Sequence, residues 1–305
     1  MTVHEKLIEK FSAAQTPGYA IRKIENGKIV FDDFGGIRAL DHSTRITKSD
    51  LWHIGSCTKS MTSFLIGMLV DEGKISFDDQ IGKILNNSIV DDLKKITVLD
   101  LLTHRSGLAE ITELKNLNWS SFVQSKESIE KLRCNLVNAI LSETKKFLRD
   151  SNFEYCNSNY LILGAILEQA HAKSWEQIIS EKIFVTLGMN DCGFGPPATK
   201  DLIPPDQPWG HKLINDVLTA VPPKEKESEP SDNPAALGPA GTVHCSFDSW
   251  SLFLQEMLLS AQGKSTLLKS STAKALFNLH RDNIAGGGWG LIERDWAQGP
   301  TYTMI

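Results

Sequence analysis

Ser56 and Lys59 are the residues of this sequence whose types and spacing are best suited to chemistry. Residues three apart share one face of a helix, so the hydroxyl and the amine can meet there. A lysine that has lost its proton can accept the proton of a serine hydroxyl, which activates the serine oxygen. The pair therefore predicts nucleophilic catalysis by serine.

The Ser-x-x-Lys spacing occurs at four places, so the surroundings must decide among them. The other three are Ser128/Lys131, Ser142/Lys145 and Ser271/Lys274. Charged neighbours at 128 and 142 predict solvated helix faces with protonated lysines. Ser56 and Lys59 instead open the most apolar helical pattern of the chain, at 56–71, where desolvation lowers a lysine pKa and the helix N-terminus favours developing negative charge. We therefore select Ser56 and Lys59.

A second polar group, Tyr155-Cys156-Asn157, lies between a polar loop and a helical pattern at 159–171. A tyrosine near a lysine cation loses its proton more readily and can serve as a general base. An asparagine amide can hold both a lysine and a substrate carbonyl. We take Tyr155 and Asn157 as the second part of the candidate site.

Strand patterns at both ends of the chain and helical patterns between them predict an α+β fold. A short helix at 5–14 precedes a hairpin around the Asn-Gly turn at 26–27, and strands are predicted at 289–296 and 301–305. Further helices are predicted at 97–103, 128–146, 175–186, 246–261 and 271–279. We expect one domain over 1–305, with a helical insertion at about 56–240 and one antiparallel sheet formed by both chain ends.

The composition excludes several other classes of function. The chain has 305 residues, of which 41% are apolar and 23% charged, and its net charge is −5. No apolar run approaches the roughly 18 residues of a membrane span, and the basic residues are scattered, so we expect neither a transmembrane segment nor nucleic-acid binding. The N-terminus lacks a signal-peptide pattern, which leaves a cytoplasmic protein and a processed periplasmic protein open. The pattern indicates no particular oligomeric state.

Sequence motifs for a cofactor or a metal are not found. Gly286-Gly287-Gly288 does not open a helix, and Gly263-Lys264-Ser265 lacks the earlier glycine of a phosphate loop. The histidines are dispersed, and the five cysteines form no Cys-x-x-Cys pair, which argues against a zinc site and a disulfide framework. A Gly-x-Ser-x-Gly elbow is also absent. We expect a small-molecule substrate and no cofactor or metal.

Gly55-Ser56-Cys57-Thr58-Lys59 together with Tyr155-Cys156-Asn157 resembles the penicillin-recognising serine hydrolases, the group of class C β-lactamases, DD-peptidases and family VIII esterases. Other segments resemble those of the group in the same order, so the resemblance covers about residues 15–305. These are Leu101–Leu108, Leu187-Gly188-Met189, Trp209-Gly210-His211 and Gly238-Pro239-Ala240-Gly241. The resemblance implies a β-lactamase/transpeptidase-like fold.

The resemblance also implies a role for each candidate residue. Ser56 would be the acylated nucleophile, with its backbone N–H as half of an oxyanion hole, and Lys59 would be its proton acceptor or electrostatic partner. Tyr155 would be the base for one half-reaction, and Asn157 would contact a substrate amide. By contrast, and despite its own resemblance to a segment of the group, we expect Leu101–Leu108 to be a packed structural turn.

Ser231-Asp232-Asn233 matches the letters of the Ser-Asp-Asn box of class A enzymes. It lies in the charged, proline-rich segment 222–234, which predicts an exposed loop, and far past the expected order. We treat the match as a coincidence.

Relatives in the group carry a third motif, Lys or His, any residue, then Gly, on a strand whose backbone completes the oxyanion hole. The residues from Gly299 to Thr303 resemble the lead-in to this motif, but Met304 stands where the Lys or His is expected and Ile305 is last. The sequence therefore predicts a chain truncated before this motif, without the C-terminal strands and helix of the group. Loss of one oxyanion donor costs about 10² to 10³ in rate.

Two functional hypotheses remain. The first is a serine hydrolase of class C β-lactamase or esterase type that forms an acyl-enzyme on a β-lactam, an ester or a D-Ala-D-Ala-type amide. The alternative is a catalytically impaired or non-catalytic family member, or a fragment that lacks the Lys/His-x-Gly strand. An in-frame Lys/His-x-Gly encoded beyond residue 305 would favour the first, and a genuine stop codon would favour the second.

Overall fold

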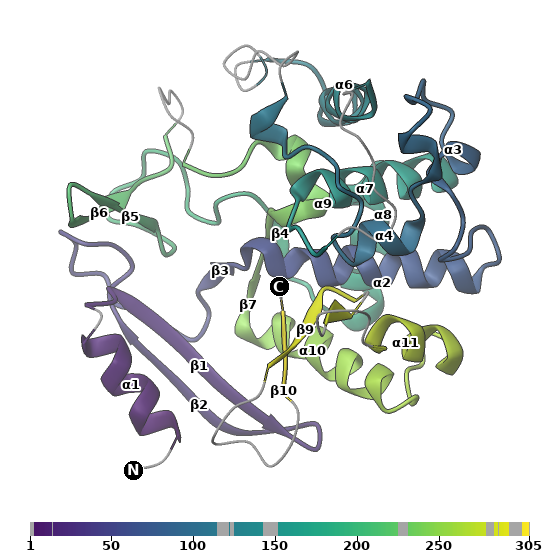
Figure 1. Cartoon of the computed structure of the whole chain (residues 1–305). Coiled ribbons are helices and arrows are strands. Elements are labelled where there is room, and N and C mark those ends of the chain that lie inside the picture. Colours follow the sequence, from purple (N-terminus) through teal and green to yellow (C-terminus); the bar gives the residue numbers. More distant parts are fainter. Residues whose placement is uncertain are drawn as a thin grey trace. The chain divides into compact units, whose positions relative to one another are not determined.

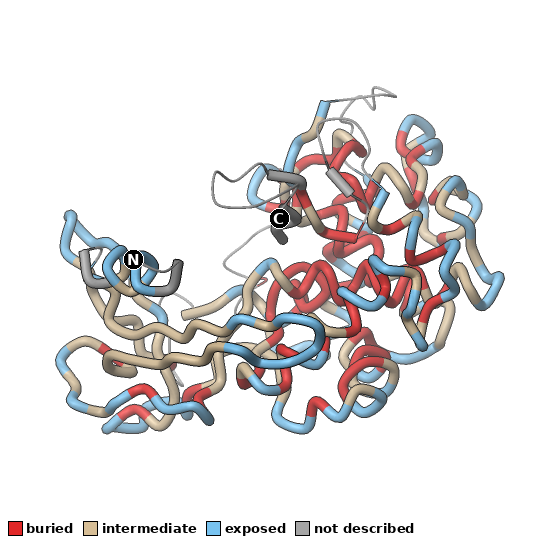
Figure 2. The backbone as a smooth tube through the Cα atoms, turned by 90° about the horizontal axis from the view of Figure 1, so that it is seen from below, coloured by how far each residue is buried: buried red, intermediate tan, exposed pale blue. Residues whose placement is uncertain are grey.

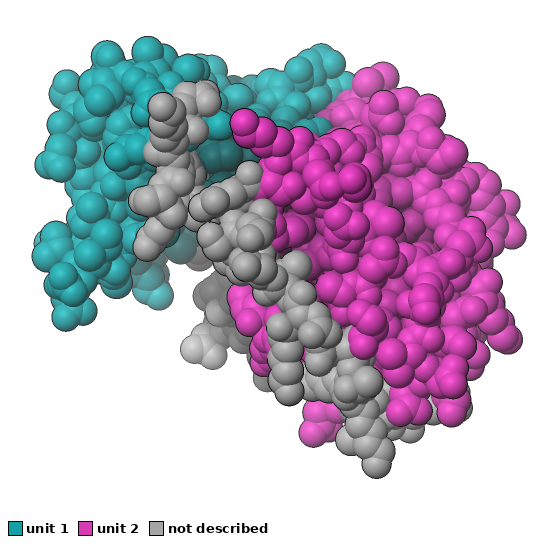
Figure 3. All heavy atoms as spheres, turned by 90° about the horizontal axis from the view of Figure 1, so that it is seen from above, with its two compact units in different colours: residues 1–53, 188–233, 243–255 teal, residues 54–187, 234–242, 256–305 magenta. Residues whose placement is uncertain are grey.

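The computed structural model divides the chain into two compact units, each made of three segments. Unit 1 comprises residues 1–53, 188–233 and 243–255, and unit 2 comprises 54–187, 234–242 and 256–305 (Figure 3). The structure describes residues 3–13, 15–114, 122, 125–142, 152–224, 231–278, 284–285, 287–292 and 301–304. Helices and antiparallel strands are both present, which confirms the predicted α+β class.

In its described residues, unit 1 contains helix α1, the first part of α10 and three groups of antiparallel strands. The elements are α1 (Val3–Ala13), β1 (Gly18–Glu25), β2 (Lys28–Gly36), β3 (Leu51–His53), β4 (Gly193–Phe194), β5 (Gly210–Ile214), β6 (Val217–Val221) and β7 (Val243–Ser246). β1 pairs with β2, β5 with β6, and β7 lies between β3 and β4. The predicted hairpin turn is confirmed at Asn26 and Gly27, whose φ angles of 49° and 73° suit an Asn-Gly pair.

Unit 2 contains most of the helices. They are η1 (Gly55–Cys57), α2 (Thr58–Asp71), α3 (Ile81–Ile84), η2 (Leu93–Lys95), α4 (Val98–Leu102), η3 (Ile111–Glu113), α6 (Ile129–Ser142), α7 (Asn157–His171), α8 (Trp175–Ile179), the π-helical η4 (Ser180–Val185), η5 (Ala235–Leu237), α9 (Gly238–Gly241) and α11 (Ser270–Phe277). α10 (Phe247–Ala261) begins in unit 1 and ends in unit 2. Among the described residues, no helix is both long and apolar enough to span a membrane.

α2 is buried along nearly its whole length, as its all-round apolar pattern predicts. Figure 2 shows in red the buried residues of the chain, which gather in its helices. α2 packs against α7 and α9 and against α11 (Figure 1). Its buried hydroxyls have partners: Thr62 Oγ1 donates to the Pro239 carbonyl at 2.8 Å, and Ser63 Oγ lies 3.1 Å from Tyr160 Oη. These bonds tie the helix to its neighbours at fixed positions.

The strands near the two chain ends lie in separate sheets. β8 (Ile284–Ala285), β9 (Trp289–Ile292) and β10 (Thr301–Met304) form an antiparallel sheet within unit 2, in the order β10-β9-β8. The sequence predicts that both ends share one sheet. Within the described ranges no backbone pairing joins β8–β10 to the β1–β2 hairpin.

Some residues named in the sequence analysis lie outside the described part of the chain. These are Gly286, Gly299, Pro300, Ile305 and residues 225–230 of the predicted loop. The same holds for positions 14, 143–146, which include Lys145, and 279 of the predicted helices, and for 293–296 of the predicted strand.

Candidate active site

Ser56 lies in the short turn that leads into α2. Gly55 before it has a φ of +52°, a left-handed conformation that glycine adopts without steric cost. Ser56 is exposed, whereas Thr58 and Lys59, which follow in the first turn of the helix, are completely buried. The turn therefore presents the hydroxyl to solvent while the lysine that could activate it is desolvated.

Lys59 Nζ has three oxygen partners. It lies 3.0 Å from Ser56 Oγ, 2.9 Å from Asn157 Oδ1 and 2.7 Å from the Ala240 carbonyl oxygen. Burial lowers the pKa of Lys59 to about 7, against an opposing effect of the Glu110 carboxylate. The neutral amine has two N–H groups and one lone pair; the amide and carbonyl oxygens can only accept, so the lone pair points at Ser56 Oγ.

The Tyr155 phenol completes the contact with the serine. Tyr155 Oη lies 2.6 Å from Ser56 Oγ, and Lys59 Nζ lies 4.8 Å from the centre of the Tyr155 ring. Burial raises the pKa of Tyr155, although the hydrogen bond with Ser56 lowers it. The sequence predicts easier proton loss beside a lysine cation. The direction differs because burial dominates, so the phenol holds its proton at neutral pH.

His104 fixes the segment that carries Tyr155. Its buried ring stacks on the Tyr155 ring, with centroids 4.6 Å apart, and its Nδ1 accepts the Cys156 N–H at 3.1 Å. Its carbonyl accepts the Glu154 N–H at 2.9 Å. Burial lowers the pKa of His104 to about 3, with the Lys59 charge acting in the same direction, so the imidazole is neutral.

Asn157 is the first residue of α7 and is held by a carboxylate that sequence reasoning missed. Glu110 Oε2 accepts the Asn157 N–H at 2.7 Å, and Glu110 Oε1 accepts from Asn157 Nδ2 at 3.3 Å. The two residues are 47 positions apart. No local pattern marks Glu110, because its role depends on a contact that only the fold creates.

The Ala240 carbonyl is positioned by tight packing around α9. A Cβ on Gly164 of α7 would lie 2.4 Å from Pro239 Cγ, so the two helices approach closely only because residue 164 is glycine. The sequence analysis names Gly238–Gly241 only as a segment that resembles the group. The contact of the Ala240 carbonyl with Lys59 is not predictable from residue types, because every residue has a backbone carbonyl.

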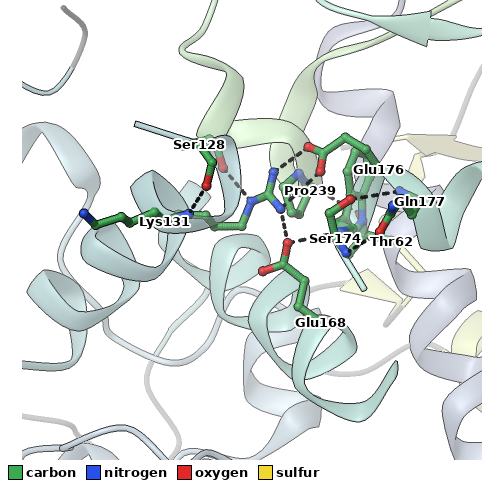
Figure 4. Close-up of polar contacts among 11 residues, drawn as sticks. Thr62, Ser128, Lys131, Glu168, Ser174, Glu176, Gln177 and Pro239 are labelled. Atoms are coloured by element: carbon green, nitrogen blue, oxygen red, sulfur yellow. Dashed lines mark hydrogen bonds and ion pairs between the residues drawn. The ribbon is translucent and has the colours of Figure 1, made fainter. Parts of the chain in front are cut away.

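A buried ion cluster holds the other side of this segment (Figure 4). Arg133 Nε donates to the Ala236 carbonyl at 2.9 Å, directly before α9. Its Nη2 lies 2.5 Å from Glu176 Oε1, and its Nη1 is paired with Glu168. The arginine is completely buried, so the cluster anchors η5 and α9 on α6, α7 and α8.

The structure thus brings Ser56, Lys59, Tyr155 and Asn157 together within unit 2. Described residues of the other Ser-x-x-Lys pairs have different surroundings. Lys131 Nζ pairs with Glu127 at 2.5 Å on an exposed helix face, and Ser271 and Lys274 are exposed.

Asp232 of the Ser-Asp-Asn match lies in unit 1 and pairs with His53 Nε2 at 3.0 Å. In the part of the chain that the structure describes, no group of three or more His, Cys, Asp or Glu side chains could hold a metal ion.

A model of the beta-lactamase family matches residues 4–302, nearly the whole chain. The chain belongs to the beta-lactamase family. Penicillin-binding protein 4 of Amycolatopsis lactamdurans is 25% identical over 194 residues, which cover 61% of this chain and 48% of that protein. Penicillin-binding protein 4* of Bacillus subtilis (strain 168) is also 25% identical over 194 residues, which cover 62% of this chain and 40% of that protein. The chain thus spans less than half of each of these relatives.

Solved structures show the same fold. The octameric penicillin-binding protein homologue from Pyrococcus abyssi superimposes with a TM-score of 0.72 and 23% identity, over 95% of this chain and 64% of that chain. D-amino acid amidase from Ochrobactrum anthropi SV3 superimposes with a TM-score of 0.71 and 18% identity, over 96% of this chain and 80% of that chain. The β-lactamase/transpeptidase-like fold is confirmed, and the family is one of serine hydrolases.

Proposed function

We propose that this member of the beta-lactamase family is a serine hydrolase that works through an acyl-enzyme on Ser56. The observation that carries the proposal is the position of Lys59 Nζ, 3.0 Å from Ser56 Oγ, with its other two contacts on oxygens that only accept. A base in this geometry is already within hydrogen-bond reach of the proton it must take.

In acylation, Ser56 Oγ attacks the acyl carbon while its proton moves to the Lys59 lone pair. The bond from the acyl carbon to its leaving oxygen or nitrogen then breaks, and the leaving atom takes a proton. Tyr155 Oη, 2.6 Å from Ser56 Oγ, can donate that proton and be reprotonated from Lys59. The Tyr155 ring, with its face toward the ammonium of Lys59, stabilises the charged intermediate.

In deacylation, a water molecule attacks the acyl carbon and the bond to Ser56 Oγ breaks. Tyr155 is the proposed base for this half-reaction. Because its phenol holds its proton, it takes a proton from the attacking water only as its own proton passes to the neutral Lys59 amine. The Lys59 ammonium, 3.0 Å from Ser56 Oγ, then returns a proton to that oxygen as the acyl bond breaks. The acid product and the free serine are restored without a cofactor, because serine, lysine and tyrosine supply both nucleophile and proton transfer.

The proposed substrates are small carbonyl compounds with a cleavable ester, β-lactam or amide bond. Relatives named as penicillin-binding proteins favour a β-lactam or a D-Ala-D-Ala-type amide, and the fold neighbour named as a D-amino acid amidase favours a simple amide. We also propose that the enzyme is of the class C β-lactamase or esterase type. The second hydrogen of Asn157 Nδ2, which has no hydrogen-bond acceptor among the described residues, would bind the substrate carbonyl.

Steady-state hydrolysis tests this proposal. A chromogenic cephalosporin, a p-nitrophenyl ester and a D-phenylalanine p-nitroanilide would be compared with wild-type protein, Ser56→Ala and Lys59→Ala. Ser271→Ala is the matched control, since it removes an exposed serine of the same Ser-x-x-Lys spacing. Turnover that is lost in the first two variants and kept in the control supports the proposal. Turnover that survives Ser56→Ala, or no turnover of any of the three by folded wild type, favours the non-catalytic alternative.

A further inference from the structure

Glu110 is a charged residue beside the candidate site to which no motif assigns a role. It is half-buried and lies at the start of η3, directly after the turn at 101–108. Within its own segment, Glu110 Oε1 accepts the Ile111 N–H at 3.0 Å, whereas Glu113 Oε2 bonds only the backbone N–H of Glu110, at 3.3 Å. The bond with the Ile111 N–H therefore orients the carboxylate independently of its contacts with α7.

This carboxylate binds the first residue of α7 at two points. Glu110 Oε2 accepts the backbone N–H of Asn157 at 2.7 Å, and Oε1 accepts from the side-chain Nδ2 at 3.3 Å. Cys156, at the cap position of α7, makes no capping bond with its side chain. Glu110 thus supplies from a distant segment the negative charge and the acceptor that a helix N-terminus favours.

The chemistry of the two partners decides which way the Asn157 amide faces. A carboxylate can only accept hydrogen bonds, so the NH₂ of Asn157 must face Glu110 and Oδ1 must face away from it. Oδ1 then lies 2.9 Å from Lys59 Nζ. With the opposite orientation, an NH₂ donor would meet the amine and compete for the lone pair that Ser56 needs.

We propose that Glu110 is a positioning residue that fixes the Asn157 amide with Oδ1 toward Lys59, so that the lysine lone pair is directed at Ser56 Oγ. The inference rests on the proposed function, because it names what makes Lys59 a base for that reaction. It also leaves the second hydrogen of Asn157 Nδ2 for a substrate oxygen. Glu110 acts through Asn157 and has no contact of its own with Ser56 among the described hydrogen bonds.

Exchange of the donor and acceptor between the two residues tests this directly. Glu110→Gln removes the acceptor-only carboxylate, so the amide can turn, and we expect the acylation rate constant to fall roughly 10- to 100-fold. Asn157→Asp places two carboxylates face to face and should lower the rate at least as much.

The double variant combines Glu110→Gln with Asn157→Asp. Its side-chain amide at position 110 can accept the backbone N–H of residue 157. The same amide can also donate a hydrogen bond to one oxygen of the carboxylate at position 157. The other oxygen of that carboxylate then faces Lys59.

The double variant should therefore lose much less than the product of the two single losses, when each is compared at the maximum of its pH profile. Glu113→Gln is the matched control, because this exposed neighbour bonds the backbone of Glu110 and has no bond to Asn157 among those described. The proposal would be overturned if the loss in acylation rate of the double variant equalled the product of the losses of the two single variants. It would also be overturned if Glu110→Gln were acylated as fast as wild type.

A second readout separates this inference from the proposed function. The Lys59 side chain would be titrated by NMR in wild type and Glu110→Gln. The groups that face Lys59 or its partners are Glu110, Cys57, Cys156, Tyr155, Tyr160 and His104. Of these, Glu110 is the largest influence that raises the pKa of Lys59, so its removal should lower that pKa further.

The Asn157 NH₂ signals should also change in Glu110→Gln, because one hydrogen loses its charged acceptor. If wild type forms no acyl-enzyme while both NMR changes occur, the proposed function fails and the positioning by Glu110 stands. If acylation occurs and neither signal responds, the positioning fails and the proposed function stands.

Discussion

At the scale of single residues, Lys59 can act as a base only in its neutral form, and its surroundings favour that form. The side chain is completely buried, and this burial lowers its pKa to about 7. The faces of Tyr155 and Tyr160, with ring centres 4.8 and 5.5 Å from Nζ, can still accommodate the ammonium that forms during reaction. The site thus tolerates both protonation states that a proton shuttle requires.

The acylation rate should follow the fraction of neutral Lys59. We expect the second-order rate constant for acylation to rise about tenfold per pH unit below pH about 7 and to level off above it, because the base is protonated at low pH. Tyr155 should not limit this plateau, since burial raises the pKa of its phenol. Stopped-flow acylation between pH 5 and about 9 measures the profile. A rate constant that stays flat between pH 5 and about 7, as expected of a base that titrates near 4 to 5 like an ordinary carboxylate, would contradict Lys59 as the base.

At the scale of elements, the site depends on how closely α9 approaches α7, since α9 brings the Ala240 carbonyl to Lys59. Gly164→Ala would place a Cβ 2.4 Å from Pro239 Cγ, in contact with a rigid ring. We expect a loss of about 1–3 kcal/mol in the free energy of unfolding and slower acylation as the Ala240 carbonyl moves away from Lys59.

Gly67→Ala is the matched control for this substitution. It too adds a methyl group in a buried helix, but the nearest atom is the flexible end of Leu276 at 2.9 Å. Denaturant unfolding and acylation kinetics would be measured on both variants. Equal effects of the two substitutions would show that the α7–α9 approach has no special role.

The Arg133 cluster of Figure 4 is the second element-scale anchor. Arg133→Met leaves two largely buried carboxylates, with 18% and 17% of the Glu168 and Glu176 side chains exposed, without their cation. We expect a loss of about 3–5 kcal/mol in unfolding free energy. Adding Glu168→Gln and Glu176→Gln to Arg133→Met should recover part of the lost unfolding free energy, because the two uncompensated charges are removed.

Lys131→Met, on the exposed face of the same helix, serves as the control for Arg133→Met. It removes a surface ion pair with Glu127, which contributes about 0–1 kcal/mol. Chemical denaturation at neutral pH compares the variants. A loss below about 1 kcal/mol for Arg133→Met would show that the cluster does not anchor η5 and α9.

Element patterns in the sequence were informative where packing follows from periodicity. α2 was predicted because apolar residues occur all around it, and the β1–β2 hairpin because Asn26-Gly27 permits a turn with positive φ. The predicted helix at 175–186 is split into α8 and the π-helical η4. Such a change in hydrogen-bond pattern leaves the apolar spacing nearly unchanged, so periodicity does not reveal it.

The candidate site was predictable only where the residue type carries the chemistry. Ser56 and Lys59 were selected because a lysine at the start of an apolar helix can lose its proton and act as a base, and Tyr155 and Asn157 were supported by the resemblance. The Ala240 carbonyl and the Glu110 carboxylate were not predictable, since the first belongs to the backbone and the second acts across 47 positions.

At the scale of the whole molecule, the buried lysine should lower the stability of the fold. The folded chain binds the Lys59 proton less tightly than the unfolded chain does, because its pKa is lowered from 10.5 to about 7. Unfolding therefore takes up a proton between these values. The cost is fully present below pH about 7 and is relieved as the pH rises toward 10.5.

Lys59→Met should accordingly be more stable than wild type and inactive. We expect a gain on the order of 1–3 kcal/mol in unfolding free energy at pH 7. The gain is smaller than the whole cost of burying the lysine, because Asn157 Oδ1 and the Ala240 carbonyl lose their hydrogen-bond donor. The gain should shrink by pH about 9.5, where wild type is relieved of the cost. Denaturant titrations at the two pH values measure it. A variant less stable than wild type at pH 7 would contradict the inference that the site retains Lys59 at the expense of stability.

The central claim is that Ser56 is acylated, and intact-protein mass spectrometry tests it most directly. Wild type, Ser56→Ala and Ser271→Ala would be exposed briefly to a penicillin, an activated ester and a D-amino acid ester, then quenched in acid. We predict an adduct with the mass of the acyl group in wild type and Ser271→Ala and none in Ser56→Ala, with the modified peptide containing Ser56. An adduct that persists in Ser56→Ala, or none from any reagent on folded wild-type protein, would contradict the account.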